Sequence, residues 1–187
     1  MAGWSSLDGR ERTVLEWLAE LRGTAFDDVM RDVSTGPPRA LVWLLATVFA
    51  CLATRSYRPF AAVLSAFVLA QVVSDLLKEL TDRPRPPAAS ALVALPANGS
   101  FPSGHATTAA AVAAALWWSS RRASLALAAF ALLIALSRVW LGVHYPTDVL
   151  AGLALGTALG LLCALATRTA SARPRGRRSR SPPPPRP

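Results

Sequence analysis

Five long apolar runs constrain this chain more than any other feature of its sequence. They cover approximately residues 40–54, 59–77, 105–119, 123–141 and 149–167. A helix needs roughly 17 to 25 mostly apolar residues to cross the hydrocarbon core of a bilayer. The first and third runs are short, but Trp43, Trp117 and Trp118 stand near their ends, as is typical of membrane interfaces. The runs therefore predict an all-α, polytopic transmembrane helical bundle of about five spans, and a sixth remains an alternative.

Composition supports a membrane protein. The chain of 187 residues is 52% hydrophobic and only 17% charged, which leaves too little polar surface for an ordinary soluble domain. Cys51 and Cys163 both lie inside apolar runs, so they indicate buried small side chains and no disulfide framework. In the last run, Gly152, Gly156 and Gly160 repeat at a spacing that lets helix backbones approach closely, which predicts a packing face.

The two ends of the chain differ from this apolar middle, which we take as a transmembrane domain over residues 39–168. Residues 1–38 predict two interfacial or capping helices, one with an apolar face of Val14, Leu15, Leu18 and Leu21, the other at 26–33. No secretory signal pattern is present in them. Residues 169–187 form a basic, proline-rich tail that we expect to be disordered. It could contact anionic lipids, and we expect it to bind no nucleic acid.

Basic residues predict the orientation in the membrane. With five spans, Arg55, Arg58, Arg121, Arg122 and the tail share one side, which holds 11 basic residues and no acids. The positive-inside rule places that side in the cytoplasm. Three polar stretches then lie together on the extracytoplasmic face of what we expect to be the plasma membrane.

These polar stretches carry most of the ionisable groups near the apolar runs. The first, KELTDRPRP at 78–86, contains Lys78 and Arg85 and could be an ordinary positive flank. The second is PSGH at 102–105. Ser103 can cap the following helix, and the amides at Ser103 and Gly104 create an anion site, but a plain helix cap does not explain His105.

The third stretch, SRVWLGVHYPTD at 137–148, places Arg138, His144 and Asp148 at the mouth of the last run. Pro146 suits the first position of a helix, so His144 and Asp148 are expected at the helix start. Taken alone, the stretch is equally consistent with a helix cap and with a catalytic pair. Arg138 offers a planar donor fork for a phosphate or a carboxylate.

Together the stretches hold the groups that phosphoryl transfer requires: cations and amides for the phosphate oxygens, a nucleophile and an acid. A zinc site of His105, His144 and Asp148 is one alternative, although neighbouring cations would repel a metal. A transporter or proton relay lined by the same residues and Arg138 is another.

Three parts of the sequence follow one another in this order: Lys78 with Arg85-Pro86, then PSGH, then Ser137-Arg138 with His144 and Asp148. Together they resemble the signature of the type 2 phosphatidic acid phosphatase superfamily. The resemblance spans approximately residues 71–152. It implies that His144 is the nucleophile that forms a phosphohistidine, that Asp148 orients it, and that His105 is the acid and later the base. Phosphate would be held by the remaining matched residues: Lys78, Arg85, Ser103, Gly104 and Arg138.

The resemblance implies neither a metal nor another cofactor, and it assigns no role to Asp82 or Arg83, which occupy positions that the family leaves free. We therefore expect a membrane phosphatase acting on a lipid phosphate, such as a phosphatidate or a polyprenyl diphosphate. A phosphotransferase of the same family shares every site residue and remains an alternative.

Overall fold

All regular secondary structure is helical in the residues that the computed structural model describes, which are 5–23, 25–35 and 38–172. The elements are α1 (Ser5–Glu20), α2 (Ala25–Thr35), α3 (Pro38–Thr54), α4 (Arg58–Thr81), the 3-10 turn η1 (Ala88–Ser90), α5 (Gly104–Ala115), α6 (Arg121–Trp140) and α7 (Pro146–Ala172). Each of the five apolar runs forms a helix, α3 to α7 in order. The tail from residue 173 lies outside the described residues.

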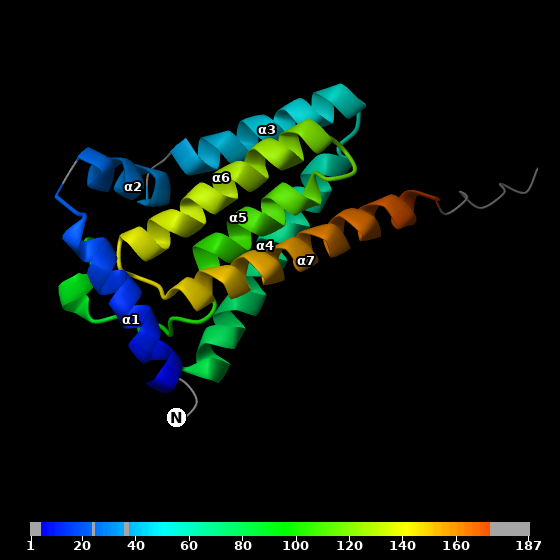
Figure 1. The fold of residues 1–187 in the computed structure, drawn as a ribbon. Coiled ribbons are helices and arrows are strands. Elements are labelled where there is room, and N and C mark those ends of the chain that lie inside the picture. Colours follow the sequence, from blue (N-terminus) through cyan, green and yellow to red (C-terminus); the bar gives the residue numbers. More distant parts are fainter. Residues whose placement is uncertain (1–4, 24, 36–37, 173–187) are drawn as a thin grey trace, which may run out of the picture.

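Helix α5 is the centre of the bundle, packed against α4, α6 and α7 (Figure 1). Its sequence, GHATTAAAVAAA, is almost entirely small side chains, and every residue from Ala106 to Ala115 is buried. The helix is shorter than the apolar run at 105–119 predicts. Hydrogen bonds from Leu116 N to Ala113 O and from Trp117 N to Ala114 O turn the chain there, toward α6. Because α5 is enclosed by other helices, it need not be as long as a helix that crosses the bilayer alone.

Glycines bring α5 and α7 into backbone contact. A Cβ atom added at Gly156 would lie 2.0 Å from Thr107 O, and one at Gly160 would lie 2.2 Å from Ala111 O. At Gly152 the same atom would lie 2.7 Å from Ser103 O. Any side chain at these positions would force the helices apart. The glycine spacing thus forms a packing face, as the sequence predicts, and it holds the start of α7 close to the start of α5.

Three helices are long and apolar enough to cross a membrane among the described residues: α4, α6 and α7 over Pro146–Thr169. The bent pair Ala25–Thr35 and Ala40–Thr54, with 54° between its parts, could form a fourth span. Helix α3 has 17 residues and α5 has 12, so both are shorter than these three helices.

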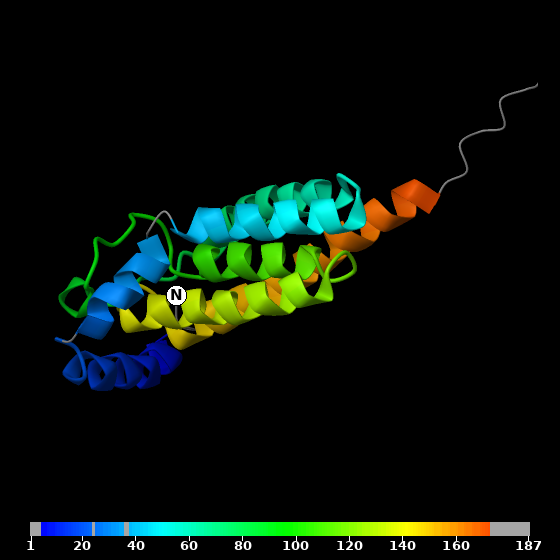
Figure 2. The same cartoon turned by 90° about the horizontal axis from the view of Figure 1, so that it is seen from above.

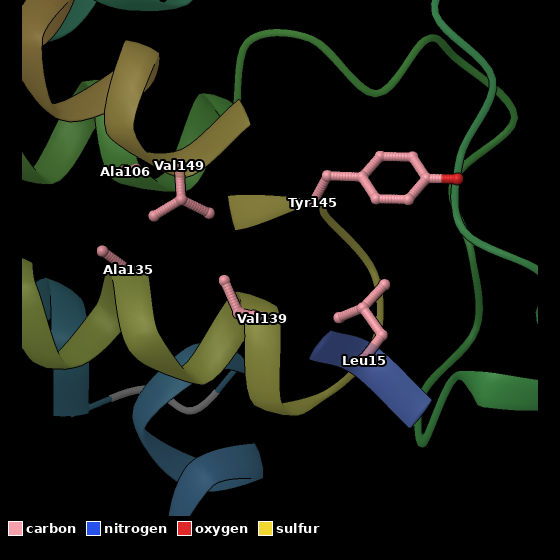
Figure 3. Close-up of a cluster of buried hydrophobic side chains, with 6 residues drawn as sticks. All are labelled: Leu15, Ala106, Ala135, Val139, Tyr145 and Val149. Atoms are coloured by element: carbon pink, nitrogen blue, oxygen red, sulfur yellow. The ribbon is translucent and has the colours of Figure 1, made fainter. Parts of the chain in front are cut away.

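Helices α1 and α2 gather at one end of the bundle with the loop that carries η1 (Figures 1 and 2). This is the end where α6 stops and where α5 and α7 begin. Leu15 of α1 is buried in a cluster with Val139, Tyr145 and Val149 (Figure 3). The Trp140 ring of α6 stacks edge-on against Phe26 and donates Nε1 to Asp27 Oδ1 at 2.8 Å. The two amino-terminal helices therefore cap the end of the bundle that holds the polar stretches.

Candidate active site

A pocket of about 250 Å³ lies at this capped end and brings the three polar stretches together. Six of the eight residues that the sequence predicts for the site line it: Lys78, Arg85, Gly104, His105, Arg138 and His144. The other two, Ser103 and Asp148, lie directly behind the pocket and are joined by a hydrogen bond of 2.9 Å from Ser103 N to Asp148 O. The remaining wall is mixed polar and aromatic, and it consists of Trp43, Phe67, Gln71, Pro96, Asn98 and Thr108.

His144 stands in the short loop between α6 and α7, with 2% of its surface exposed. The loop reverses direction at Gly142, whose φ of +69° and close approach to Ser90 O exclude a side chain. On one side of the ring, His144 Nε2 lies 3.3 Å from Arg85 Nη1. On the other, Nδ1 lies 3.4 Å from Asp148 Oδ2, near enough for an ion pair but outside hydrogen-bond alignment. The ring is thus held with Nε2 beside a pocket cation and Nδ1 beside a carboxylate.

The pKa of His144 is lowered from its ordinary value to about 4, chiefly because the ring is buried. The charges of Arg85 and Arg138 contribute to this decrease, whereas Asp148 opposes it. The imidazole is therefore neutral at pH 7, the form in which a ring nitrogen can act as a nucleophile.

Asp148, in the first turn of α7, is completely buried and has a partner on each oxygen. Its Oδ2 accepts hydrogen bonds from Tyr145 N at 2.9 Å and from Ser100 Oγ. Its Oδ1 accepts from Arg83 Nη1 at 2.5 Å. These bonds hold the carboxylate in one orientation, facing His144, and α7 begins at Pro146 as the sequence predicts.

Arg83 is the residue that the sequence analysis missed. Its side chain has no exposed surface and donates to three carboxylates: Asp148, Asp8 at 2.7 Å and Glu11 at 2.5 Å. Glu11 also accepts from Thr147 N at 2.7 Å, so α1 is bonded both to Arg83 and to the start of α7. The spacing of two acids on one face of a helix was visible in the sequence, but nothing there identified the distant arginine as their partner.

The three cations that line the pocket make hydrogen bonds to neutral or exposed groups. Arg85 donates to Val143 O at 2.9 Å and to Asn98 Oδ1 at 2.8 Å. Lys78 Nζ lies 2.6 Å from Asp75, which is largely exposed, and Arg138 donates to Ser34 Oγ of α2. The acceptors of Arg85 in the described residues are all uncharged, so its positive charge is available to an anion in the pocket.

The PSGH stretch forms the start of α5, but Ser103 does not cap it with its side chain. Ser103 occupies the cap position and makes no side-chain capping bond. Its hydroxyl is buried and has no hydrogen-bond partner among the described residues. The expectation of a capping hydroxyl is wrong, and the Ser103 amide, which the sequence analysis assigned to an anion site, is bonded to Asp148 O. A Cβ atom at Gly104 would lie 3.1 Å from Lys78 Nζ, so the glycine leaves room for the lysine beside the helix start.

The arrangement can take up an anion and attack it. Three cations and Gly104, at the start of α5, line the pocket beside a neutral, oriented imidazole, and His105 faces the same space. The Ser103 hydroxyl, which has no hydrogen-bond partner among the described residues, lies behind them. In the described ranges, no three or more His, Cys, Asp or Glu side chains gather in a geometry that could hold a metal ion. Both oxygens of Asp148 are engaged by protein donors, which does not fit the zinc alternative.

Comparison with known proteins agrees with this geometry. A model of the PAP2 superfamily matches residues 59–172. A decaprenylphosphoryl-5-phosphoribose phosphatase of Mycobacterium tuberculosis (strain H37Rv) is 35% identical over 136 residues, covering 71% of this chain and 75% of that protein. The undecaprenyl-diphosphatase BcrC of Bacillus subtilis (strain 168) is 32% identical over 126 residues, covering 66% of this chain and 64% of that protein.

Solved structures show the same fold. The crystal structure of the transmembrane PAP2 type phosphatidylglycerolphosphate phosphatase from Bacillus subtilis superposes with a TM-score of 0.71 at 23% identity, covering 92% of this chain and 90% of that chain. The crystal structure of Aquifex aeolicus LpxE superposes with a TM-score of 0.61, also at 23% identity, covering 84% of this chain and 93% of that chain. At these identities the likeness concerns the fold alone.

Proposed function

The chain belongs to the PAP2 superfamily, and on that basis we propose that it is an integral-membrane phosphatase that hydrolyses a lipid phosphate through a phosphohistidine on His144. The observation that carries the proposal is the pocket itself, where a neutral imidazole and its carboxylate partner stand beside three cations. The relatives named above are phosphatases of lipid-linked phosphates.

In the first step, His144 Nε2 attacks phosphorus and the bond from phosphorus to the leaving oxygen breaks. Arg85, Lys78 and Arg138 hold the non-bridging phosphate oxygens, with the free hydroxyl of Ser103 as a further donor. Asp148 stabilises the positive charge that develops on the ring through Nδ1. His105 gives its proton to the leaving oxygen, which departs as an alcohol or as a phosphate.

In the second step, His105 takes a proton from water, and the resulting nucleophile attacks the phosphorus of the phosphohistidine. The bond from phosphorus to Nε2 breaks, inorganic phosphate leaves, and His144 returns to its neutral state. No step in this sequence needs a metal ion or another cofactor, since the cations of the chain take up the phosphate charge.

The proposed substrate is an amphiphile whose phosphate reaches the pocket at the level of the membrane surface. Trp43 and Phe67 form an aromatic wall of the pocket, 6.3 Å between ring centroids, on helices α3 and α4. Such a wall suits a hydrocarbon chain next to the phosphate. With the basic tail in the cytoplasm, the pocket faces the extracytoplasmic side of the plasma membrane.

The test is phosphate release from phosphatidate and from a polyprenyl diphosphate in detergent. His144→Ala is expected to reduce release to background, because no other group replaces the attacking nitrogen, while a chelator leaves the wild-type rate unchanged. Asp82→Asn is the matched control, since Asp82 is an exposed carboxylate in the same sequence stretch as Arg83 and Arg85, with a φ that asparagine tolerates. Full activity of the His144→Ala variant would refute the proposal.

A further inference from the structure

We propose that Gln71 and Thr108 form a second subsite in the pocket, which binds an uncharged, hydrogen-bonding group between the phosphate and the hydrocarbon chain of the substrate. This inference rests on the proposed function and narrows it. It predicts a preference for phosphate monoesters whose phosphate is joined to the chain by hydroxyl- or ester-bearing atoms. A diphosphate, which carries a second charge at that place, is the less favoured substrate.

The pocket changes in polarity along α4. Lys78, Gln71 and Phe67 line it, and their spacings of seven and four residues place them on one face of the helix. Gln71 lies about 10 Å along the axis from Lys78, and Phe67 about 6 Å beyond Gln71. The wall therefore runs from a cation through a neutral amide to an aromatic ring. An amphiphile with its phosphate at Lys78 would place its next atoms against Gln71 and its hydrocarbon against Phe67.

Helix α5 supplies the other half of the subsite. Thr108 lies one turn along α5 from Gly104. Its hydroxyl donates to Gln71 Oε1 at 2.7 Å and also lies 2.8 Å from Gly104 O. These contacts fix the carbonyl end of the Gln71 side chain. The amide nitrogen at the other end makes no hydrogen bond within the described residues, and Gln71 is exposed. A donor is thus presented to the pocket in a fixed orientation.

A purely structural role for Gln71 would be to join α4 to α5 by its bond to Thr108. That role uses the carbonyl and leaves the amide nitrogen unexplained. An unpaired polar group at the depth of a membrane span is costly, so such residues usually serve a site. A substrate oxygen would complete the hydrogen bonding of this amide.

The charges in the pocket favour an uncharged group at Gln71. The charges of Arg85 and Arg138 act on the His144 ring, and Lys78 lies beside Gly104. Together with His105, which donates a proton in the proposed first step, these are the cations that line the pocket in the described part of the chain. Thr108 is bonded to Gln71 and Phe67 lies one turn away on α4, and neither can neutralise a second phosphate. Burying an uncompensated phosphate there would be costly, whereas a hydroxyl or an ester oxygen would be bound without a charge.

The experiment compares kcat/KM on four substrates in detergent. Phosphatidate presents glycerol ester oxygens, and a polyprenylphosphoryl pentose with a terminal phosphate presents sugar hydroxyls next to the scissile phosphate. A polyprenyl diphosphate presents a charge, and the monophosphate of the same polyprenol presents only hydrocarbon. The ratio of variant to wild type on each substrate cancels the differences between their chains.

Gln71→Leu is expected to lower kcat/KM about three- to tenfold, the range for one uncharged hydrogen bond, on phosphatidate or on the pentose substrate. The substrate with the larger loss identifies which oxygens are bound. The values for the diphosphate and the polyprenyl monophosphate stay within twofold. Thr108→Val keeps the shape of the side chain but removes the hydroxyl that holds the Gln71 amide. It is expected to change the ratios in the same direction.

Ser65→Ala on the same helix is the matched control, because the Ser65 hydroxyl is bonded to Ala61 O at 2.7 Å and does not line the pocket. Equal losses of kcat/KM on all four substrates, or no loss with either variant, would overturn the inference. The proposed phosphatase function would be unaffected by that result. Failure of the wild type to release phosphate from any of them would overturn the proposed function itself.

Discussion

His144 acts in surroundings that disfavour its charged form before a substrate arrives. Its ring is buried, Arg85 and Arg138 direct positive charge toward it, and a single carboxylate partner, Asp148, acts in the opposite direction. In the proposed mechanism, the positive charge of the ring that is bonded to phosphorus is offset both by Asp148 and by the phosphate. The same surroundings would thus keep the proposed nucleophile neutral and stabilise the charged intermediate.

The protonation of His144 can be measured directly, because the chain has two histidines. In a His105→Gln variant with isotope-labelled histidine, one imidazole remains for NMR titration. A pKa of about 4 means that the ring stays neutral as the pH falls through 6.5 and takes up its proton only near pH 4. A midpoint at or above 6.5 would contradict the structure. In the wild type, the rate should then fall at high pH, as His105 loses the proton it donates, and at low pH, as His144 gains one.

At the scale of elements, α1 is bonded to the catalytic end although it precedes the segment that matches the family, residues 59–172. Asp8 and Glu11 engage Arg83, and Arg83 holds Asp148. Glu11 also accepts from the backbone of Thr147, in the first turn of α7. A helix outside the family segment therefore contributes to the position of the carboxylate that orients the nucleophile.

Glu11→Gln keeps the size of the side chain and removes its charge, so it weakens the bonds to Arg83 and Thr147. A hydrogen bond to a charged group contributes about 1.5 to 3 kcal/mol, which predicts a melting temperature lower by roughly 3 to 12 °C for a chain of this size. The same variant should have a reduced kcat with KM nearly unchanged, because the phosphate-binding cations are untouched. Glu20→Gln, an exposed acid on the same helix, is the control for thermal unfolding and kinetics. Identical behaviour of the two variants would contradict a role for α1.

At the scale of the whole molecule, the bundle places an ionic site at one end and an apolar wall leading away from it. Glycines of α7 bring its start against α5, so that PSGH and the loop of His144 meet. The amino-terminal helices cover that end (Figure 2), and α3 and α4 line the pocket with Trp43, Phe67 and Gln71. The overall arrangement suits a substrate that is anchored in the membrane by a hydrocarbon chain.

The sequence predicted the helices and the residues of the pocket because both depend on local patterns. Apolar runs mark α3 to α7, and the three polar stretches stand at their ends, where one membrane face brings them together. Patterns of this kind also predicted the glycine face of α7.

What the sequence could not predict depends on contacts between distant segments. Arg83 is bonded to carboxylates 72 and 75 residues away in the sequence, and Gln71 is bonded to Thr108, 37 residues away. The length of α5 depends on burial by its neighbours, and the Ser103 amide is bonded to Asp148 of α7, while its hydroxyl has no partner in the described part of the chain. Such pairings need the packing of the bundle, which no periodicity in the sequence describes.

The most direct test of the central claim is to identify the residue that carries the phosphoryl group. The His105→Gln variant lacks the proposed base for the second step, so a substrate with a good leaving group, such as p-nitrophenyl phosphate, should make it accumulate the intermediate. After an alkaline quench, mass spectrometry of the peptides is expected to find one phosphate, on His144. Phosphate on another side chain such as Ser103, or continued turnover with His144 unmodified, would contradict the account.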